Sequence, residues 1–250
     1  MESIRAIVPA AGKGTRLKSE DNIPKVMHKL CGKPLLQHVL EQLSFIEPKD
    51  ICIVVGYLKE QITSYFGDRY QYAEQVPQLG TGHAVKVCEP LFRDYTGTVL
   101  VTFGDMPLFR GSVMKKMCEY HIQVGAACTL LTATNPDLKY WARIVRDQNG
   151  RFSRIVEAKD CSPREAGITE LFSGVLTFDS QKLFSTLPRL DTNNAQGEYY
   201  LTEVPELMAH DGLKVETFPT DDGDDLRGVN TPEDFIICQQ VLEKRMAHCY

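Results

Sequence analysis

A short apolar run over residues 4–8 opens directly into a loop of small residues. Its length and the glycines that follow it predict a buried strand. In α/β proteins, a strand that opens into such a loop brings backbone N–H groups close to phosphate oxygens. Lys13 and Arg16 lie in this loop, and Lys25 follows a few residues later. The segment therefore predicts an α/β enzyme that handles a nucleoside triphosphate.

Strand-like and helix-like segments alternate through the first half of the chain. Strands are expected at residues 4–8, 51–55, 98–103 and 126–133, and helices at 34–45, 58–66, 84–91 and 112–120. This alternation predicts a mainly parallel sheet with helices on both faces.

The pattern changes after about residue 135. Strands are expected at 142–146, 152–157 and 173–178, the first two joined by a hairpin-like turn, and helices at 202–210 and 232–246, the second with Thr231 as N-cap. We expect a single domain, 1–250, with a mainly nucleotide-binding part (1–135), a smaller mixed or antiparallel acceptor-binding part (136–230) and a C-terminal helix (231–250).

The composition excludes several classes of protein. A net charge of −5 argues against nucleic-acid binding, and no apolar run reaches transmembrane length. The eight cysteines form no C-x-x-C pair and no cluster with the histidines, so a zinc site is not expected. Reduced thiols and the lack of a signal-peptide pattern predict a cytoplasmic protein. The acidic run at 221–225 lacks the spacing of a calcium loop and predicts a solvated loop.

The first glycine loop does not fit two common nucleotide-binding patterns. The dinucleotide pattern G-x-G-x-x-G fails at Leu17, and the second strand ends without the acidic residue that this pattern needs, which excludes a nicotinamide-dependent oxidoreductase. No Walker loop occurs either. A second glycine loop at 78–84 either frames a base edge or a phosphate with its N–H groups, or is an ordinary turn before a helix.

Asp105 follows the predicted strand at 98–103. Ligands of open α/β sheets bind at the carboxyl ends of strands, where a carboxylate can hold Mg²⁺. The alternative is a residue that caps the turn at the strand end. Asn230, taken alone, has the character of a turn residue.

Together, these segments resemble the uridylyltransferase domain of the bacterial N-acetylglucosamine-1-phosphate uridylyltransferases, of the sugar nucleotidyltransferase superfamily. The similarity covers nearly the whole chain. The motifs, in the family's order, lie at residues 10–16 (AAGKGTR), 24–26 (PKV), 78–84 (QLGTGHA), 104–108 (GDMPL), 143–146 (RIVR), 155–160 (IVEAKD), 194–202 (NAQGEYYLT) and 228–230 (GVN). The resemblance implies a Rossmann-like nucleotidyltransferase fold. It also implies that a sugar 1-phosphate attacks the α-phosphorus of UTP and that pyrophosphate leaves.

The resemblance implies roles for residues at matching positions. The catalytic groups would be Arg16, Lys25 and Asp105, and the ligands of a catalytic Mg²⁺ would be Asp105 and Asn230. The nucleotide contacts would come from Ala10, Ala11, Gly12, Gly14, Thr15, Gln75, Gly80 and Thr81. The acceptor contacts would come from Ala142, Glu157, Phe172, Tyr200 and Thr202. Phosphoryl transfer relies on cations and positioning more than on a protein nucleophile, which suits these residue types.

Three features depart from the family. Ala142 replaces a glycine and Phe172 replaces an asparagine, at positions where the family contacts the amino sugar. Alanine adds a methyl group, and phenylalanine removes a hydrogen-bonding amide. Hexapeptide repeats are absent as well, so neither acetyl transfer nor the trimer built by a left-handed β-helix is expected.

The leading hypothesis is a magnesium-dependent uridylyltransferase that makes a UDP-sugar from UTP and N-acetylglucosamine 1-phosphate, without a nucleic-acid or membrane partner. Its nearest rival is an enzyme of the same fold that uses CTP or another phosphorylated acceptor, because of Ala142 and Phe172. The rival from another class is a non-catalytic module that binds nucleotide sugars, against which the basic and acidic site residues argue. The oligomeric state is left open.

Overall fold

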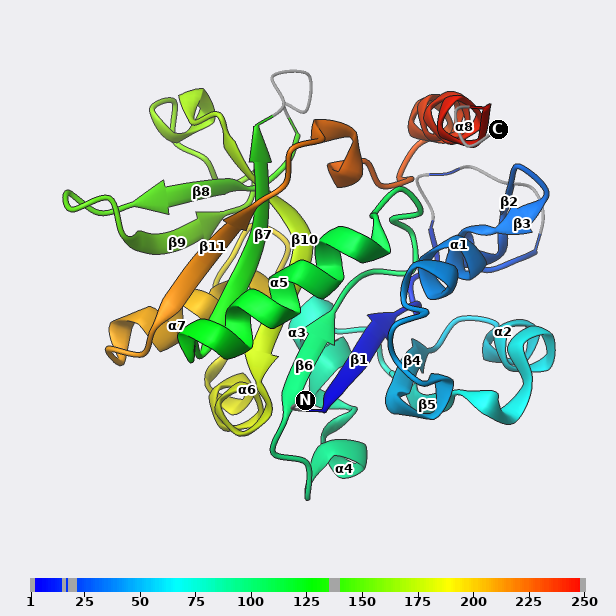
Figure 1. Ribbon diagram of the computed structural model, residues 1–250, viewed down its shortest axis with the longest axis horizontal. Coiled ribbons are helices and arrows are strands. Elements are labelled where there is room, and N and C mark those ends of the chain that lie inside the picture. The colour runs from blue at the N-terminus through cyan, green and yellow to red at the C-terminus, as the bar shows by residue number, and fades with distance from the viewer. Residues whose placement is uncertain (1–2, 15–16, 18–21, 135–139, 248–250) are drawn as a thin grey trace.

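A central mixed sheet forms the body of the molecule (Figure 1). The computed structural model describes residues 3–14, 17, 22–134 and 140–247. Along the sheet the strands lie in the order β11 (Val215–Pro219), β7 (Cys128–Thr134), β10 (Glu170–Asp179), β6 (Thr98–Val101), β1 (Ile4–Pro9), β4 (Ile51–Val55) and β5 (Gln71–Glu74). Strands β6, β1, β4 and β5 pair in parallel, and so do β7 and β11, whereas β10 runs antiparallel to both of its neighbours. A hairpin of β8 (Arg143–Arg146) and β9 (Phe152–Val156) extends from β10.

Helices cover both faces of this sheet. Alternate residues of β1 point to opposite sides: Ile7 packs in one apolar cluster, and Ala6 and Val8 pack in the other. The first cluster contains α3 (Thr81–Lys86), α4 (Glu89–Phe92), α6 (Ser180–Thr186) and α7 (Val204–His210). The second contains α1 (Leu35–Gln42), α2 (Lys59–Phe66) and α5 (Gly111–Val124). Both faces of the parallel strands are therefore buried, as their continuous apolar runs require.

The last helix, α8 (Pro232–Ala247), packs beside the small hairpin of β2 (Lys29–Leu30) and β3 (Lys33–Pro34). Short 3-10 helices occupy Lys25–Met27, Pro48–Asp50, Gly67–Arg69, Glu165–Gly167, Leu187–Arg189, Leu201–Glu203 and Gly223–Leu226.

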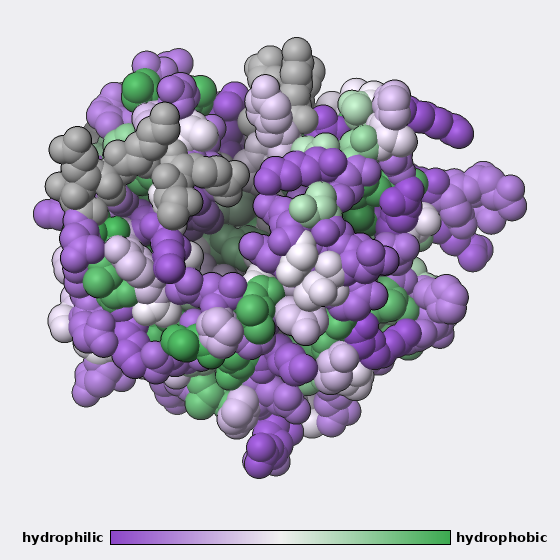
Figure 2. Space-filling view, turned by 180° about the vertical axis from the view of Figure 1, so that it is seen from behind, coloured by the Kyte–Doolittle hydropathy of each residue, from purple (hydrophilic) through white to green (hydrophobic). Residues whose placement is uncertain are grey.

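No helix within the described ranges is both long enough and apolar enough to cross a bilayer. The face in Figure 2 is mainly hydrophilic and is hollowed near its middle.

The predicted α/β class is confirmed, with a mostly parallel sheet between two layers of helices. The helix expected at 84–91 is divided into α3 and α4. The edge strands β5 and β11 and helix α6 had no sequence prediction. Thr231 caps α8 as expected, because its hydroxyl accepts a hydrogen bond from the Asp234 N–H at 3.1 Å. The division of the chain at residues 135 and 230 stays a prediction.

The acidic run at 221–225 is solvated only in part: Asp221 is 85% exposed, but the expectation of a solvated loop was wrong for Asp225. Asp225 is fully buried and lies 2.8 Å from Arg110 and 3.1 Å from Arg245. Arg245 also pairs with Asp222 at 2.7 Å. Sequence could not show this, because Arg110 directly precedes α5 and Arg245 lies on α8, both away from the acidic run in the sequence. The cluster joins both helices to the segment that leads to Asn230.

Candidate active site

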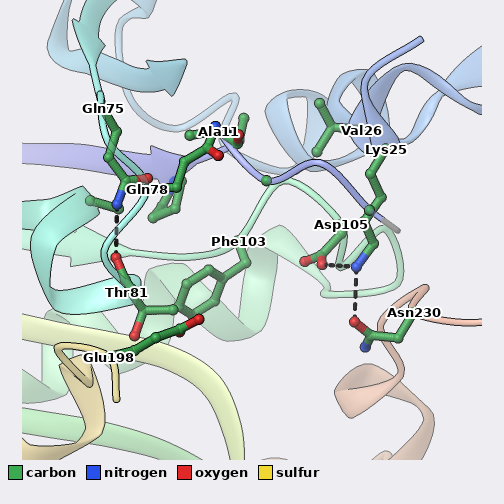
Figure 3. A pocket seen from close by; sticks show the side chains of 16 residues that line it. Ala11, Lys25, Val26, Gln75, Gln78, Thr81, Phe103, Asp105, Glu198 and Asn230 are labelled. Atoms are coloured by element: carbon green, nitrogen blue, oxygen red, sulfur yellow. Dashed lines mark hydrogen bonds and ion pairs between the residues drawn. The ribbon is translucent and has the colours of Figure 1, made fainter. Parts of the chain in front are cut away.

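A cleft of about 330 Å³ lies at the carboxyl ends of β1 and β6 (Figure 3). Its lining comes from separate parts of the chain: Pro9, Ala10, Ala11, Gly12, Gly14, Lys25, Val26, Gln75, Gln78, Gly80, Thr81, Ala84, Phe103, Asp105, Glu198 and Asn230. The structure thus brings together most of the residues predicted for nucleotide and metal binding. Thr15 and Arg16 lie outside the described residues.

The first glycine loop forms one wall of the cleft. Gly14 has φ +65°, and a Cβ there would lie 2.5 Å from the Lys25 Cβ, so glycine alone fits over the lysine stem. A Cβ on Gly12 would meet no atom within 4 Å. The loop is tied to β4, because the Ala10 N–H donates to the Val54 carbonyl at 2.8 Å. The open space at Gly12 leaves room for a ligand close to the backbone.

The second glycine loop forms the opposite wall. Gly80 has φ +110°, and a Cβ there would lie 2.6 Å from the Tyr199 carbonyl oxygen, so the loop packs against backbone that is 119 residues away in sequence. The Thr81 hydroxyl accepts a hydrogen bond from the Leu201 N–H at 3.0 Å. The loop lines the cleft and leads into α3, and its contact with a base edge or a phosphate stays a prediction.

Two glutamines fix the geometry between the walls. Buried Gln75 donates from Nε2 to the Gly80 carbonyl at 2.9 Å, and the same nitrogen lies 3.3 Å from His83 Nδ1. Burial lowers the pKa of His83, which favours the neutral ring that accepts this bond. Gln78 donates from Nε2 to the Ala11 carbonyl at 2.9 Å. With its amide nitrogen engaged, Gln75 keeps its amide oxygen for a donor on a bound base.

A cationic centre occupies the other end of the cleft (Figure 3). The Lys25 Nζ lies 2.5 Å from Asp105 Oδ2 and donates to Asn230 Oδ1 at 2.9 Å. Asp105 lies in the loop after β6, and its carbonyl accepts the Val229 N–H at 2.9 Å, which holds the asparagine segment beside it. Lys25 is buried. Asp105 and Asn230, which are far apart in sequence, therefore contact the same ammonium group, and their role as metal ligands stays a prediction.

These two oxygens fit a divalent cation. Both contact the same ammonium nitrogen, so they converge on a single cation position, and a carboxylate and an amide oxygen are the hard ligands that Mg²⁺ prefers. The described residues contain no group of three or more His, Cys, Asp and Glu side chains placed to hold a metal. A site with two protein ligands suits Mg²⁺, which commonly takes its remaining ligands from water and substrate phosphates.

Three of the predicted acceptor residues gather beside the second glycine loop. The Thr202 hydroxyl donates to Glu157 Oε1 at 3.1 Å, and burial raises the pKa of Glu157. The buried Tyr200 hydroxyl accepts a hydrogen bond from Gln196 Nε2 at 2.8 Å. From the same segment, Glu198 lines the cleft itself.

Ala142 and Phe172 are adjacent in the fold. The Phe172 N–H donates to the Ala142 carbonyl at 3.0 Å, and both residues are 5% exposed within one apolar cluster. Both departures from the family named above therefore lie at the same point of the fold. Their contact with an acceptor stays a prediction.

Sequence reasoning assigned no role to Gln78, Phe103 or Glu198, which also line the cleft. Gln78 and Glu198 belong to the motifs at 78–84 and 194–202, so their place in these motifs could have pointed to the cleft. Phe103 follows a buried strand, and nothing in its sequence setting distinguishes it from a core residue.

Comparisons with known proteins agree with this geometry. A sequence profile described as the MobA-like NTP transferase domain matches residues 6–197. The bifunctional protein GlmU of Enterococcus faecalis is 42% identical over 246 residues, 98% of this chain and 53% of that protein. GlmU of Levilactobacillus brevis is 45% identical over 230 residues, 92% and 50% of the two chains. The chain thus spans about half the length of the curated relatives that it matches.

Two solved structures share the fold at low sequence identity. One is a UDP-glucose pyrophosphorylase complexed with UDP-glucose, with a TM-score of 0.80, 20% identity and coverage of 98% of this chain and 100% of the other. The second is a putative glucose-1-phosphate thymidylyltransferase from Bacillus anthracis, with a TM-score of 0.76, 20% identity and coverage of 96% and 95%.

Proposed function

Because the chain belongs to the MobA-like NTP transferase family, it is a nucleotidyltransferase, and we propose that it transfers a uridylyl group from UTP to a sugar 1-phosphate. The acceptor that we propose is N-acetylglucosamine 1-phosphate, in line with the similarity to GlmU proteins. The observation that carries the proposal is the meeting of Lys25, Asp105 and Asn230 between two glycine loops. A cleft of this kind suits a substrate with several negative charges and one base.

The proposed reaction is a single displacement. A phosphate oxygen of the sugar 1-phosphate forms a new bond to the α-phosphorus of UTP, and the bond from that phosphorus to the bridging oxygen of the β-phosphate breaks. Pyrophosphate carries the bonding electrons away. No protein nucleophile is needed, so the residues bind, orient and neutralise charge.

We assign the triphosphate to the first glycine loop, at Ala10, Ala11, Gly12 and Gly14, with Thr15 and Arg16 beside it. Lys25 would neutralise phosphate charge as the pyrophosphate departs. Asp105 and Asn230 would hold Mg²⁺, which when bound supplies two further positive charges to the phosphates.

We assign the base to the second glycine loop. The Gln75 amide oxygen would accept the N3–H of uracil, and the backbone at Gly80 and Thr81 would frame the base edge. Cytosine has an acceptor at the N3 position, so this arrangement favours UTP over CTP.

The acceptor sugar would be held by Glu157, Tyr200 and Thr202, with Ala142 and Phe172 forming its apolar border. A second candidate function uses the same chemistry on another phosphorylated acceptor. It is favoured by one observation, namely that Phe172 lies within an apolar cluster at a position where an asparagine was expected.

A panel of sugar 1-phosphates and other phosphorylated acceptors, each with UTP or CTP and Mg²⁺, tests these proposals through pyrophosphate release. We expect turnover with UTP and N-acetylglucosamine 1-phosphate. Turnover only with another acceptor would favour the second candidate, and turnover with CTP alone would contradict the base assignment. If no combination releases pyrophosphate, the proposed reaction is wrong.

A further inference from the structure

We propose that the Lys25 ammonium occupies the divalent-cation position of the nucleotide-free protein, so that metal and nucleotide enter together in exchange for it. The proposal rests on the proposed function for the identity of the nucleotide. It adds that Lys25 opposes metal binding in the free protein and serves the phosphates only after it has been displaced.

The contacts of the ammonium group carry this inference. The nitrogen lies 2.5 Å from Asp105 Oδ2 and 2.9 Å from Asn230 Oδ1, the two oxygens that fit a hard cation. Figure 3 shows the lysine reaching between both side chains. A metal ion bound by the same two oxygens would need the space that the ammonium fills. The two cations therefore exclude one another sterically and repel one another electrostatically.

The described residues that line the cleft offer the Lys25 ammonium no second pair of partners like Asp105 and Asn230. The lysine stem lies under Gly14, where even an added Cβ would approach the Lys25 Cβ to 2.5 Å, so only the end of the side chain can swing. Among the described residues that line the cleft, the other carboxylate is that of Glu198. Glu198 lies across the cleft from Asp105 in Figure 3. Displacement by a metal alone would thus separate a buried ammonium from its carboxylate.

A triphosphate changes this balance. Its oxygens offer new partners to the displaced ammonium and additional ligands to the metal. Nucleotide binding therefore offsets the free energy that metal binding costs by displacing Lys25, and the two ligands bind cooperatively. Metal binding to the free protein is then weak, and metal binding with nucleotide is strong. A lysine that bound only phosphate and lay away from these two oxygens would change metal affinity in the free protein far less when it is removed.

The test measures Mn²⁺ binding by the loss of the free-ion signal in electron paramagnetic resonance, without turnover. Lys25→Met removes the charge but keeps an apolar stem. We expect the nucleotide-free Lys25→Met protein to bind Mn²⁺ more tightly than wild type, by about tenfold to a hundredfold, the usual range of coupling between ligands. Lys33→Met is the matched control, because Lys33 pairs with Glu41 on the exposed surface and its loss leaves the cleft intact.

Two further measurements keep the result interpretable. In a Lys25→Met/Asp105→Asn protein the gain should disappear, which ties the bound ion to Asp105. In wild type, a non-hydrolysable UTP analogue should tighten Mn²⁺ binding beyond the affinity of the analogue for Mn²⁺ alone. Thermal unfolding confirms that each variant is folded.

Equal or weaker Mn²⁺ binding by folded Lys25→Met would overturn the exchange, as would a gain that survives the loss of Asp105. These outcomes do not depend on catalysis. If the substrate panel shows no turnover but Lys25→Met still gains Mn²⁺ affinity, the proposed reaction fails and the exchange stands. If turnover occurs and the gain is absent, the exchange alone is wrong.

Discussion

The Asp105 carboxylate contacts the Lys25 ammonium at the position proposed for the metal. Its negative charge therefore neutralises whichever cation occupies this end of the cleft. Asp105→Asn keeps its shape and removes its charge. We predict a loss of turnover of about a hundredfold to a thousandfold, the size found when one preorganised charge-stabilising group is removed. The buried Lys25 ammonium loses its charged partner in this variant, so the thermal midpoint should fall even though the backbone bond from Val229 to Asp105 remains. Pyrophosphate release at saturating substrates measures the effect, and near-normal turnover would remove Asp105 from the proposed mechanism.

For single residues, sequence reasoning was strongest where a motif follows the carboxyl end of a buried strand. Asp105 is the example, because the end of β6 fixes its place in any parallel sheet of this kind. Its nearness to Asn230, with which it shares the Lys25 ammonium, could not be derived from spacing, since the two residues come together through the fold; the pairing came from the family resemblance. The burial of Asp225 was missed for the same reason, because its partners, Arg110 before α5 and Arg245 on α8, are distant in the sequence.

At the scale of elements, the second glycine loop depends on its backbone conformation. Gly80→Ala would place a Cβ 2.6 Å from the Tyr199 carbonyl at φ +110°, so we predict destabilisation of about 1–3 kcal/mol and weaker nucleotide binding. Gly167→Ala is the control, because a Cβ there meets nothing within 4 Å and its φ is ordinary. Urea unfolding and nucleotide titration measure both effects. The idea fails if the two variants behave alike.

Helix α5 provides a pH-dependent contact with the sheet. His121 on this helix is 3% exposed, its Nδ1 lies 2.9 Å from the Thr129 hydroxyl on β7, and burial lowers its pKa from 6.5 to about 4. The unfolded chain therefore binds the proton first as pH falls. The stability contributed by neutral His121 is present above pH 6.5 and is lost between pH 6.5 and about 4.

We predict that this one residue lowers the unfolding free energy by roughly 3 kcal/mol over that range. His121→Asn keeps a polar partner for Thr129 and does not titrate. Urea unfolding of both proteins at several pH values should show a difference in stability that shrinks as pH falls through the window. Parallel curves for wild type and variant would contradict the assignment.

Element prediction succeeded for buried strands and failed at sheet edges. β1, β4 and β6 are mostly apolar, with Arg5 and Thr98 as exceptions, because both of their faces are covered, and such runs are visible in sequence. β5 and β11 lie at the two edges, and their mixed polar sequences resemble loops. These two segments form strands because each pairs with a neighbouring strand, and the local sequence pattern carries no information about that neighbour.

At the scale of the whole molecule, the Arg110–Asp225–Arg245 cluster joins α5 and α8 to the segment before Asn230. Removing the buried charge by Asp225→Asn leaves two guanidinium groups facing one another. We predict a loss of about 3–5 kcal/mol in unfolding free energy, as is usual when one partner of a buried ion pair is removed. Asp221→Asn is the control, because that side chain pairs with the same Arg110 but is 85% exposed. Urea unfolding should leave the control close to wild type, and equal losses would show that burial of Asp225 is not the cause.

The central claim is that a sugar 1-phosphate oxygen attacks the α-phosphorus of a nucleoside triphosphate in this cleft. The most direct measurement uses N-acetylglucosamine 1-phosphate labelled with ¹⁸O in its phosphate, incubated with UTP and Mg²⁺ and analysed by mass spectrometry. The account predicts that all of the label stays in the UDP-sugar, including the new bridging oxygen, and that the pyrophosphate is unlabelled. Label in the pyrophosphate, or no UDP-sugar from this or any other labelled sugar 1-phosphate, would contradict it.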